Sequence, residues 1–297
     1  MTAAGGVAER TPSAMHDFVS LTKPRIISLL LVTTIAPMYV AATPSLGSVL
    51  LVLTGGYLMA GGANAVNMYL DRDIDDVMTR TRLRPIPSGR MTPIAVLAFG
   101  VALASAATYL FGRFVNILTA VLALGGFYFY VWIYTRWLKR SSPQNIVIGG
   151  AAGAFPPLVG WAAATGSLNL TAIYLFLIVF YWTPPHFWAL ALNKQRDYGN
   201  AGVPMAPLVW GERETKNQMM LYSIVLVVLT LLPVTFGAFG WIYGASAALL
   251  GAWFLRDAFL VRNAAEFAKP AWRLYGYSLL YLALIFAAMV VDRRVLG

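Results

Sequence analysis

Residues 217–255 read NQMMLYSIVLVVLTLLPVTFGAFGWIYGASAALLGAWFL and carry no acidic or basic side chain. A membrane-spanning helix needs about 20 mostly apolar residues, so these 39 residues are too many for one span. Gly237 and Gly240 predict a tight turn near the middle of the stretch. The stretch therefore predicts two consecutive helices that cross a lipid bilayer.

The rest of the 297-residue chain has the same character, because 59% of its residues are hydrophobic and only 11% are charged. Soluble domains carry about 25% charged residues, so a soluble fold is excluded. The chain has no cysteine, which excludes disulfides and thiolate metal sites. We predict an all-α integral membrane protein whose nine spans are 26–42, 48–70, 93–111, 114–135, 144–164, 170–192, 217–237, 239–255 and 274–291.

The basic residues indicate the orientation of these spans. With the N-terminus in the cytoplasm, the inner segments hold 19 of the 22 lysines and arginines, as the positive-inside rule requires. The net charge of +10 therefore calls for no nucleic-acid partner. Residues 1–20 lack the arginine-rich composition of an organelle transit peptide. We expect a multi-pass protein of the bacterial inner (plasma) membrane, with a flexible cytoplasmic segment at 1–20, one transmembrane domain at 21–297 and the C-terminus outside.

The second predicted span ends in a stripe of oxygen-bearing side chains. Asn67, Asp71 and Asp75 are spaced four residues apart, so on a helix they share one face over about 12 Å. Carboxylate and amide oxygens suit Mg²⁺, which often shares its coordination sphere with substrate phosphates. The stripe therefore indicates a magnesium site at the membrane edge. The alternative is a solvated helix end whose acids balance nearby arginines.

The inner loop that follows, residues 71–92, is rich in arginine, including Arg80 and Arg84. Arginine binds phosphate oxygens through two parallel hydrogen bonds. Lys139 and Arg140, at the end of the fourth span, add cations on the same side of the membrane. Magnesium and these cations together indicate a diphosphate site. The alternative is that the basic residues only set the topology.

A second inner loop, residues 193–216, follows the sixth span as the first loop follows the second. It begins with Asn193 and Asp197, which repeat the four-residue spacing of Asn67 and Asp71. This match indicates an internal duplication, and it predicts that both loops form one active-site rim. A duplication of this kind would allow two half-sites to face each other across a central cavity.

His186 is the only ionisable residue within the interiors of spans two to eight. Ionisable residues inside a membrane are candidates for function. The alternative is a neutral histidine bonded to a carbonyl group that Pro184 or Pro185 leaves without its helical partner.

Several segments of the chain, read in order, resemble a known family. They are LTKPR (21–25), DRDIDDVMTRTRLRPIPSGR (71–90), SPQNIVIGG (142–150), PPLVGW (156–161), PHFW (185–188) and DYGNAG (197–202). With the Asn67–Asp71–Asp75 spacing, they resemble the intramembrane prenyltransferases of the UbiA superfamily and, within it, the protohaem IX farnesyltransferases (haem O synthases). The resemblance covers about residues 20–295.

The resemblance implies nine helices around a central cavity and an enzyme that transfers a farnesyl group from farnesyl diphosphate to a vinyl group of protohaem IX. Hydration would complete haem O. By position, Asn67, Asp71, Asp75 and Asp197 would bind Mg²⁺ and act in catalysis. The diphosphate would contact Lys23, Arg25, Arg80, Arg84, Lys139 and Arg140. His186 and Trp188 would contact the haem, and terminal-oxidase assembly factors or haem A synthase would be partners.

One position departs from the superfamily pattern, because Asn193 stands where the second motif usually has aspartate. A neutral amide there implies fewer metal ions or weaker binding. Two other functions stay open. One is prenylation of an aromatic quinone precursor, and the other is transport across the membrane. The position of the acids at one rim, away from the bilayer midplane, argues against a transporter.

Overall fold

The computed structural model describes residues 13–296, which form helices and no strands. Nine of these helices are long and apolar enough to cross a membrane, as the sequence predicts. The long elements are α2 (Pro24–Ala41), α3 (Leu46–Leu70), α5 (Pro93–Phe114), the span Ile117–Ser141, α8 (Asn145–Thr165), α9 (Leu170–Asn193), α12 (Gly211–Thr235), α13 (Trp241–Asn263) and α14 (Ala268–Val295).

Most of these helices extend beyond the apolar runs that predict them. One case is α12, which starts six residues before its predicted span because the polar residues from Gly211 onwards continue the helix. Hydropathy detects only the part of a helix that matches the hydrocarbon layer, so it misses such polar ends. The predicted turn between the seventh and eighth spans is confirmed, since α12 ends at Thr235 and α13 begins at Trp241.

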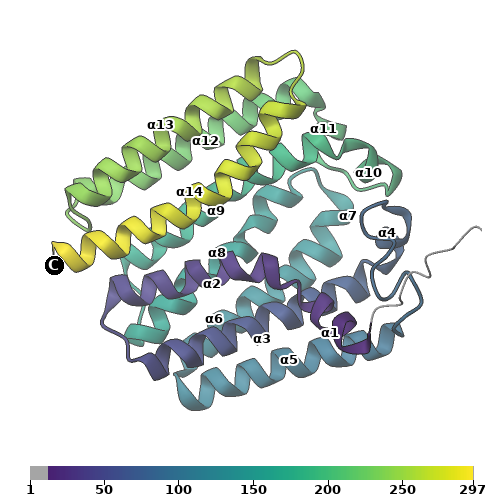
Figure 1. The fold of residues 1–297 in the computed structure, drawn as a ribbon, viewed down its shortest axis with the longest axis horizontal. Coiled ribbons are helices and arrows are strands. Elements are labelled where there is room, and N and C mark those ends of the chain that lie inside the picture. Colours follow the sequence, from purple (N-terminus) through teal and green to yellow (C-terminus); the bar gives the residue numbers. More distant parts are fainter. Residues whose placement is uncertain (1–12, 297) are drawn as a thin grey trace, which may run out of the picture.

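Four short helices accompany the spans: α1 (Ala14–Thr22), α4 (Arg72–Val77), α10 (Gln195–Asn200) and α11 (Ala206–Val209). A fifth, α7 (Lys139–Ser141), is the last turn of the fourth span. In Figure 1, α4, α7, α10 and α11 lie at one end of the bundle, on the right, and the C-terminus lies at the opposite end. The inner loops 71–92 and 193–216 therefore share one end of the protein, as the sequence predicts. We call this end the rim.

The expected flexible segment 1–20 lies partly outside the described residues. Its described part differs from the expectation, because residues 14–20 belong to helix α1. Ser13 caps this helix by accepting a hydrogen bond from the amide of His16 over 3.3 Å. Asp17 and Leu21 are buried against the rest of the protein, which explains why the segment is ordered.

Small residues let the spans approach closely. On α8, a Cβ atom at Gly160 would overlap the carbonyl oxygen of Thr34 on α2. A Cβ atom at Gly62 on α3 would lie 2.6 Å from the carbonyl oxygen of Gly100 on α5. Contacts between small residues are typical of helix packing in membranes, where no hydrophobic effect drives the helices together.

The fourth span changes its helical type along its length. It starts as α6 (Ile117–Tyr128), continues as the π-helix η1 (Phe129–Leu138) and ends as α7. A π-helix pairs residues five apart, is rare, and is frequently found at functional sites. The sequence predicts the span but not this change.

Candidate active site

The predicted oxygen stripe starts on α3 and continues through α4. Although α3 ends at Leu70, the amide of Asp71 bonds the carbonyl of Asn67 over 2.9 Å, and the amide of Asp75 bonds that of Asp71 over 2.8 Å. The helical hydrogen-bonding pattern therefore continues from α3 into α4. The Asn67 side chain donates to Asp71 Oδ2 over 2.7 Å, which confirms that these two residues share a face. All three stripe residues are at most 4% exposed.

Both buried carboxylates of the stripe are paired with cations from other segments. Lys139 Nζ donates to Asp71 Oδ2 over 2.5 Å. Arg84 Nη1 donates to Asp75 Oδ2 over 2.6 Å. Burying a charge without a partner costs several kcal/mol, so these cations are what allow the two carboxylates to be buried.

Arg140 joins the same cluster from α7. It binds both carboxylate oxygens of Asp73 over 2.7 Å and donates to the Leu70 carbonyl over 2.8 Å. Its Nη2 atom lies 3.6 Å from Asp71 Oδ1. The hydrogen bonds from Arg140 lower the pKa of the exposed Asp73 carboxyl to about 2, so Asp73 stays charged at neutral pH.

Lys23 reaches the stripe from the junction between α1 and α2. It adopts a left-handed backbone conformation with φ of 55°, and its Nζ atom donates to Asn67 Oδ1 over 3.3 Å. Burial, followed by the positive charge of Arg84, lowers the pKa of Lys23 from 10.5 to about 7. Its proton is therefore weakly held, and an anion beside it would hold that proton more firmly.

The π-helix η1 presents one polar side to the stripe. Thr135 Oγ1 accepts a hydrogen bond from Asn67 Nδ2 over 3.1 Å and donates to the Tyr130 carbonyl, five residues earlier, over 2.8 Å. Tyr130 and Tyr134 stack with ring centres 5.7 Å apart. The end of the fourth span thus brings the Thr135 hydroxyl and, one turn on, Lys139 to the stripe. Thr135 was not predicted, and nothing in the sequence marks it.

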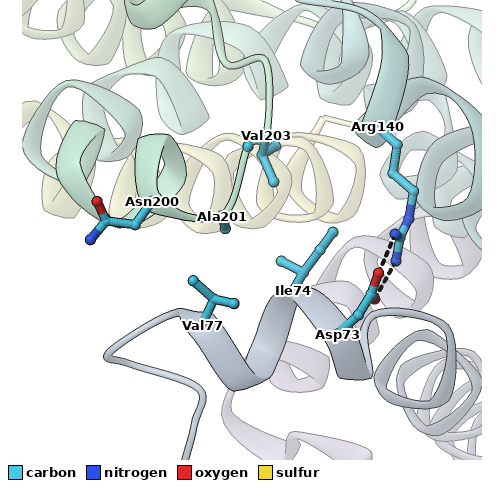
Figure 2. A pocket seen from close by; sticks show the side chains of 8 residues that line it. Asp73, Ile74, Val77, Arg140, Asn200, Ala201 and Val203 are labelled. Carbon is cyan, nitrogen blue, oxygen red and sulfur yellow. Dashed lines mark hydrogen bonds and ion pairs between the residues drawn. The ribbon is translucent and has the colours of Figure 1, made fainter.

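The two inner loops meet at the rim. Arg80 Nη2 donates to the Tyr198 hydroxyl over 3.1 Å, and its guanidinium lies 5.1 Å from the centre of the Tyr198 ring. A cleft of about 310 Å³ opens between α4 and the segment after α10. Figure 2 shows Ile74 and Val77 on one wall, Ala201 and Val203 on the other, and the Asp73–Arg140 pair at one end.

Like Arg80, two further residues predicted to bind the metal or the diphosphate lie apart from the stripe's contacts. Arg25, in the first turn of α2, is exposed. Asp197 is half-buried on α10, beside Tyr198. Asn193, at the end of α9, donates to the Ala189 carbonyl over 3.1 Å in its own helix. The rim thus contains all three residues, while the ion pairs gather around Asp71 and Asp75.

The stripe has the chemistry of a magnesium site. Its donors are two carboxylates and an amide, and Asp71 Oδ1 is buried without a hydrogen-bond donor among the described residues. A hard cation satisfies such an oxygen. Within residues 13–296, no three acidic or histidine side chains gather closely enough to hold a metal ion by themselves. The residues fit Mg²⁺ when the phosphate oxygens of a substrate complete its ligands.

His186 lies in an aromatic stack between α9 and α14. Its ring packs between Trp182 and Tyr275, with centres 4.3 and 4.6 Å away. Its Nδ1 atom is 2.6 Å from Ser278 Oγ. The hydrogen-bond partner is therefore a serine hydroxyl on α14, and not a carbonyl group that a proline leaves free.

Trp188 is turned to a different side of α9. It is 0% exposed and packs edge-on against Trp210 and Tyr222. Residues two positions apart on a helix do not share a face. The structure therefore separates His186 from Trp188, and Trp188 has no free surface for a haem contact in this arrangement.

A buried ion pair fixes the far end of the first inner loop. Asp17 on α1 is 3% exposed and accepts hydrogen bonds from Arg90 Nε over 3.0 Å and from Arg90 Nη2 over 3.0 Å. Arg90 Nη2 also donates to the Leu83 carbonyl over 3.1 Å, next to Arg84. No local pattern in the sequence marks Asp17 as the partner of Arg90, because 73 positions separate the two residues.

The family model of the UbiA prenyltransferases matches residues 29–285 of this chain. The chain belongs to the UbiA prenyltransferase family. Its UbiA-family relatives include proteins named protoheme IX farnesyltransferase from Roseiflexus sp. (strain RS-1) and Symbiobacterium thermophilum. The first is 55% identical over 97% of this chain and 54% of its own length, and the second is 53% identical over 94% of each. The chain therefore spans about half the length of the Roseiflexus relative.

Solved structures share the UbiA architecture. A UbiA homologue from Archaeoglobus fulgidus, bound to DMAPP and Mg²⁺, superposes with a TM-score of 0.67 at 15% identity, covering 91% of this chain and 99% of that one. This likeness shows the fold. The predicted UbiA-type helical bundle is thereby confirmed, and the central cavity stays a prediction.

Proposed function

We propose that the chain transfers the farnesyl group of farnesyl diphosphate to a vinyl group of protohaem IX and that water completes the product, haem O. The buried stripe Asn67–Asp71–Asp75 carries this proposal, because cations from three other segments contact it. These cations are Lys23, Arg84 and Lys139. The names of the relatives that share about half of their residues with this chain support the choice of substrates.

Asn67, Asp71 and Asp75, joined by Asp197, would hold Mg²⁺, and the metal would neutralise charge on the departing diphosphate. The chain's own cations would also neutralise charge on the departing diphosphate. Lys139 and Arg84 now bond Asp71 and Asp75, and a metal on those carboxylates would release both cations toward phosphate oxygens. Charge-assisted donors aimed at the leaving group stabilise the transition state.

Lys23, Arg80 and Arg140 complete the proposed diphosphate site. Lys23 already contacts the stripe through Asn67. Arg80 joins the two loops through Tyr198. An anion between the loops would accept hydrogen bonds from the remaining N–H groups of Arg80. Arg25 is a weaker candidate, because its side chain is exposed at the start of α2.

The reaction breaks the bond between the farnesyl carbon and the diphosphate oxygen, which leaves an allylic cation. The stacked rings of Tyr130 and Tyr134 belong to η1, the helix that contacts the stripe through Thr135. Aromatic faces stabilise cations, and burial limits early attack by water. The haem vinyl group then forms the new carbon–carbon bond, and water adds to the resulting carbocation and releases a proton.

His186 is the proposed haem contact. The hydrogen bond at Nδ1 and the two stacked rings fix the orientation of its imidazole. A fixed ring leaves Nε2 as the nitrogen for a haem iron or propionate.

The proposal also includes the bacterial inner membrane as the location, with the rim facing the cytoplasm. It rests on the distribution of lysine and arginine along the chain. Terminal-oxidase assembly factors and haem A synthase are the proposed recipients of the product.

The test is a direct assay of product identity. Membranes containing the chain are incubated with farnesyl diphosphate and either protohaem IX or an aromatic acid, and products are identified by mass. We expect only the haem to gain the hydroxyethylfarnesyl group, EDTA to stop the reaction and Mg²⁺ to restore it. Prenylation of the aromatic acid alone would overturn the haem assignment, and full turnover in EDTA would overturn the metal.

A further inference from the structure

A second cleft lies at the rim end of the protein, between the first turns of α12 and the last turn of α13. Its volume is about 370 Å³. It is lined by Glu212, Arg213, Lys216, Asn217, Arg262 and Asn263. These residues belong neither to the oxygen stripe nor to the first cleft, which lies between α4 and the segment after α10. The proposed prenyl transfer therefore gives the second cleft no role.

The lining is strongly cationic. Three of its side chains are positively charged, and its one carboxylate, Glu212, already accepts a hydrogen bond from Gln195 over 2.8 Å. Lys216 is 9% exposed, and its Nζ atom donates to the Ala264 carbonyl over 3.1 Å. Because an ammonium group carries three N–H donors, Lys216 can serve an anion without losing this bond.

Arg262 is held in place by its neighbour across the cleft. Its Nε atom donates to Asn217 Oδ1 over 3.1 Å. This bond joins the two helices and fixes the guanidinium beside the opening. Lys216 and Arg262 are thus donors whose positions are fixed by hydrogen bonds, and both line the cleft.

The surface next to the cleft is apolar. On α12, the positions that follow Asn217 at helical spacing are Leu221, Ile224 and Val228, which are 53%, 43% and 51% exposed. On α13, Phe259 lies one turn before Arg262 and is 54% exposed. Exposed apolar rows on spanning helices face lipid tails. Cations at the head of such rows match an anionic headgroup above its acyl chains.

We propose that this cleft binds the phosphate of an anionic phospholipid, whose acyl chains lie along the exposed faces of α12 and α13. A phospholipid headgroup and free phosphate would both bring a phosphate anion to the cleft. The apolar rows favour a lipid over free phosphate as its source. This site is independent of the prenyl-transfer proposal, because it involves different helices.

The test uses the full chain in nanodiscs of phosphatidylglycerol or phosphatidylcholine with identical acyl chains. Thermal unfolding and native mass spectrometry report stability and retained lipid. We expect phosphatidylglycerol to raise the Tm of the wild type and to stay bound. In Arg213→Gln/Arg262→Gln, the Tm gain should disappear and the apparent affinity for phosphatidylglycerol should fall about tenfold.

Two further variants make the result decisive. Arg82→Gln removes an exposed arginine from the rim, outside the cleft, and should keep the full lipid effect. Arg213→Gln alone changes an exposed side chain and gives a readout if the double variant does not fold. Equal phosphatidylglycerol effects in the wild type and both cleft variants would overturn the site. Stabilisation of the wild type by inorganic phosphate to the same extent, abolished by the cleft substitutions, would overturn the lipid as its ligand.

Discussion

Asp17 on α1 and Arg90 at the end of the first inner loop form a buried ion pair, with two hydrogen bonds of 3.0 Å. Arg90 also holds the carbonyl of Leu83, and the next residue, Arg84, is the partner of Asp75. The pair therefore ties the N-terminal helix to the backbone that positions a proposed diphosphate ligand.

Asp17→Asn should loosen this loop without removing any group that touches substrate. We expect the KM for farnesyl diphosphate to rise about threefold to tenfold, with a smaller change in kcat. The reason is that the substitution would displace Arg84 without removing a group that contacts the substrate. Steady-state kinetics in membranes test this. Asp17→Glu should recover most of the affinity, and a purely structural role would instead lower the amount of folded protein without altering the KM.

The stripe itself gives a prediction with a matched control. Asp71→Asn should reduce turnover by at least about a hundredfold, because it removes a charge that the metal and Lys139 share. Asp76 belongs to the same helical segment but is exposed, so Asp76→Asn should retain near wild-type activity. Product formation per folded protein distinguishes the two. Equal activity in both variants would remove the stripe from the mechanism.

The orientation can be tested cleanly because the chain contains no cysteine. Ser88 lies exposed in the first inner loop, and Ser167 lies exposed in the turn between α8 and α9 at the other end. In spheroplasts, an impermeant maleimide should label Ser167→Cys and should label Ser88→Cys only after lysis. The reverse pattern would place the rim outside the cell.

Close packing of α2 against α8 predicts a large effect of a single methyl group. Gly160→Ala would press Cβ against the Thr34 carbonyl and should cost about 1–3 kcal/mol of unfolding free energy. Gly153 lies on the same helix with open space around its Cβ position, so Gly153→Ala should be neutral or slightly stabilising. Thermal unfolding in one detergent compares the two, and equal losses would contradict the packing argument.

The sequence predicts features that depend on local repetition. Apolar runs locate the nine spans because length and hydropathy are the conditions for crossing a bilayer. The four-residue spacing places Asn67 beside Asp71 because a helix repeats its faces at that distance. The same rule could have separated His186 from Trp188, since side chains two positions apart point to nearly opposite sides of a helix.

Other features depend on contacts between distant segments and could not be predicted in this way. The Asp17–Arg90 pair and the Arg80–Tyr198 bond join residues 73 and 118 positions apart. No local pattern specifies such partners, and an arginine that sets topology looks the same in sequence as one that holds a carboxylate.

The wide helix η1 determines the direction in which Lys139 points. Each residue of an ordinary helix turns the chain by about 100°, and each residue of the wider η1 turns it by somewhat less. Deleting one residue within Phe129–Leu138 would therefore rotate everything after it about the helix axis. Such a shortened span would still cross the bilayer. Its Lys139 would no longer reach Asp71, and Arg140, which also follows the deletion, would move with it, so the buried carboxylate would lose both cations. We therefore expect the fourth span, Ile117–Ser141, to tolerate changes of side chain on its lipid face far better than any change in its length.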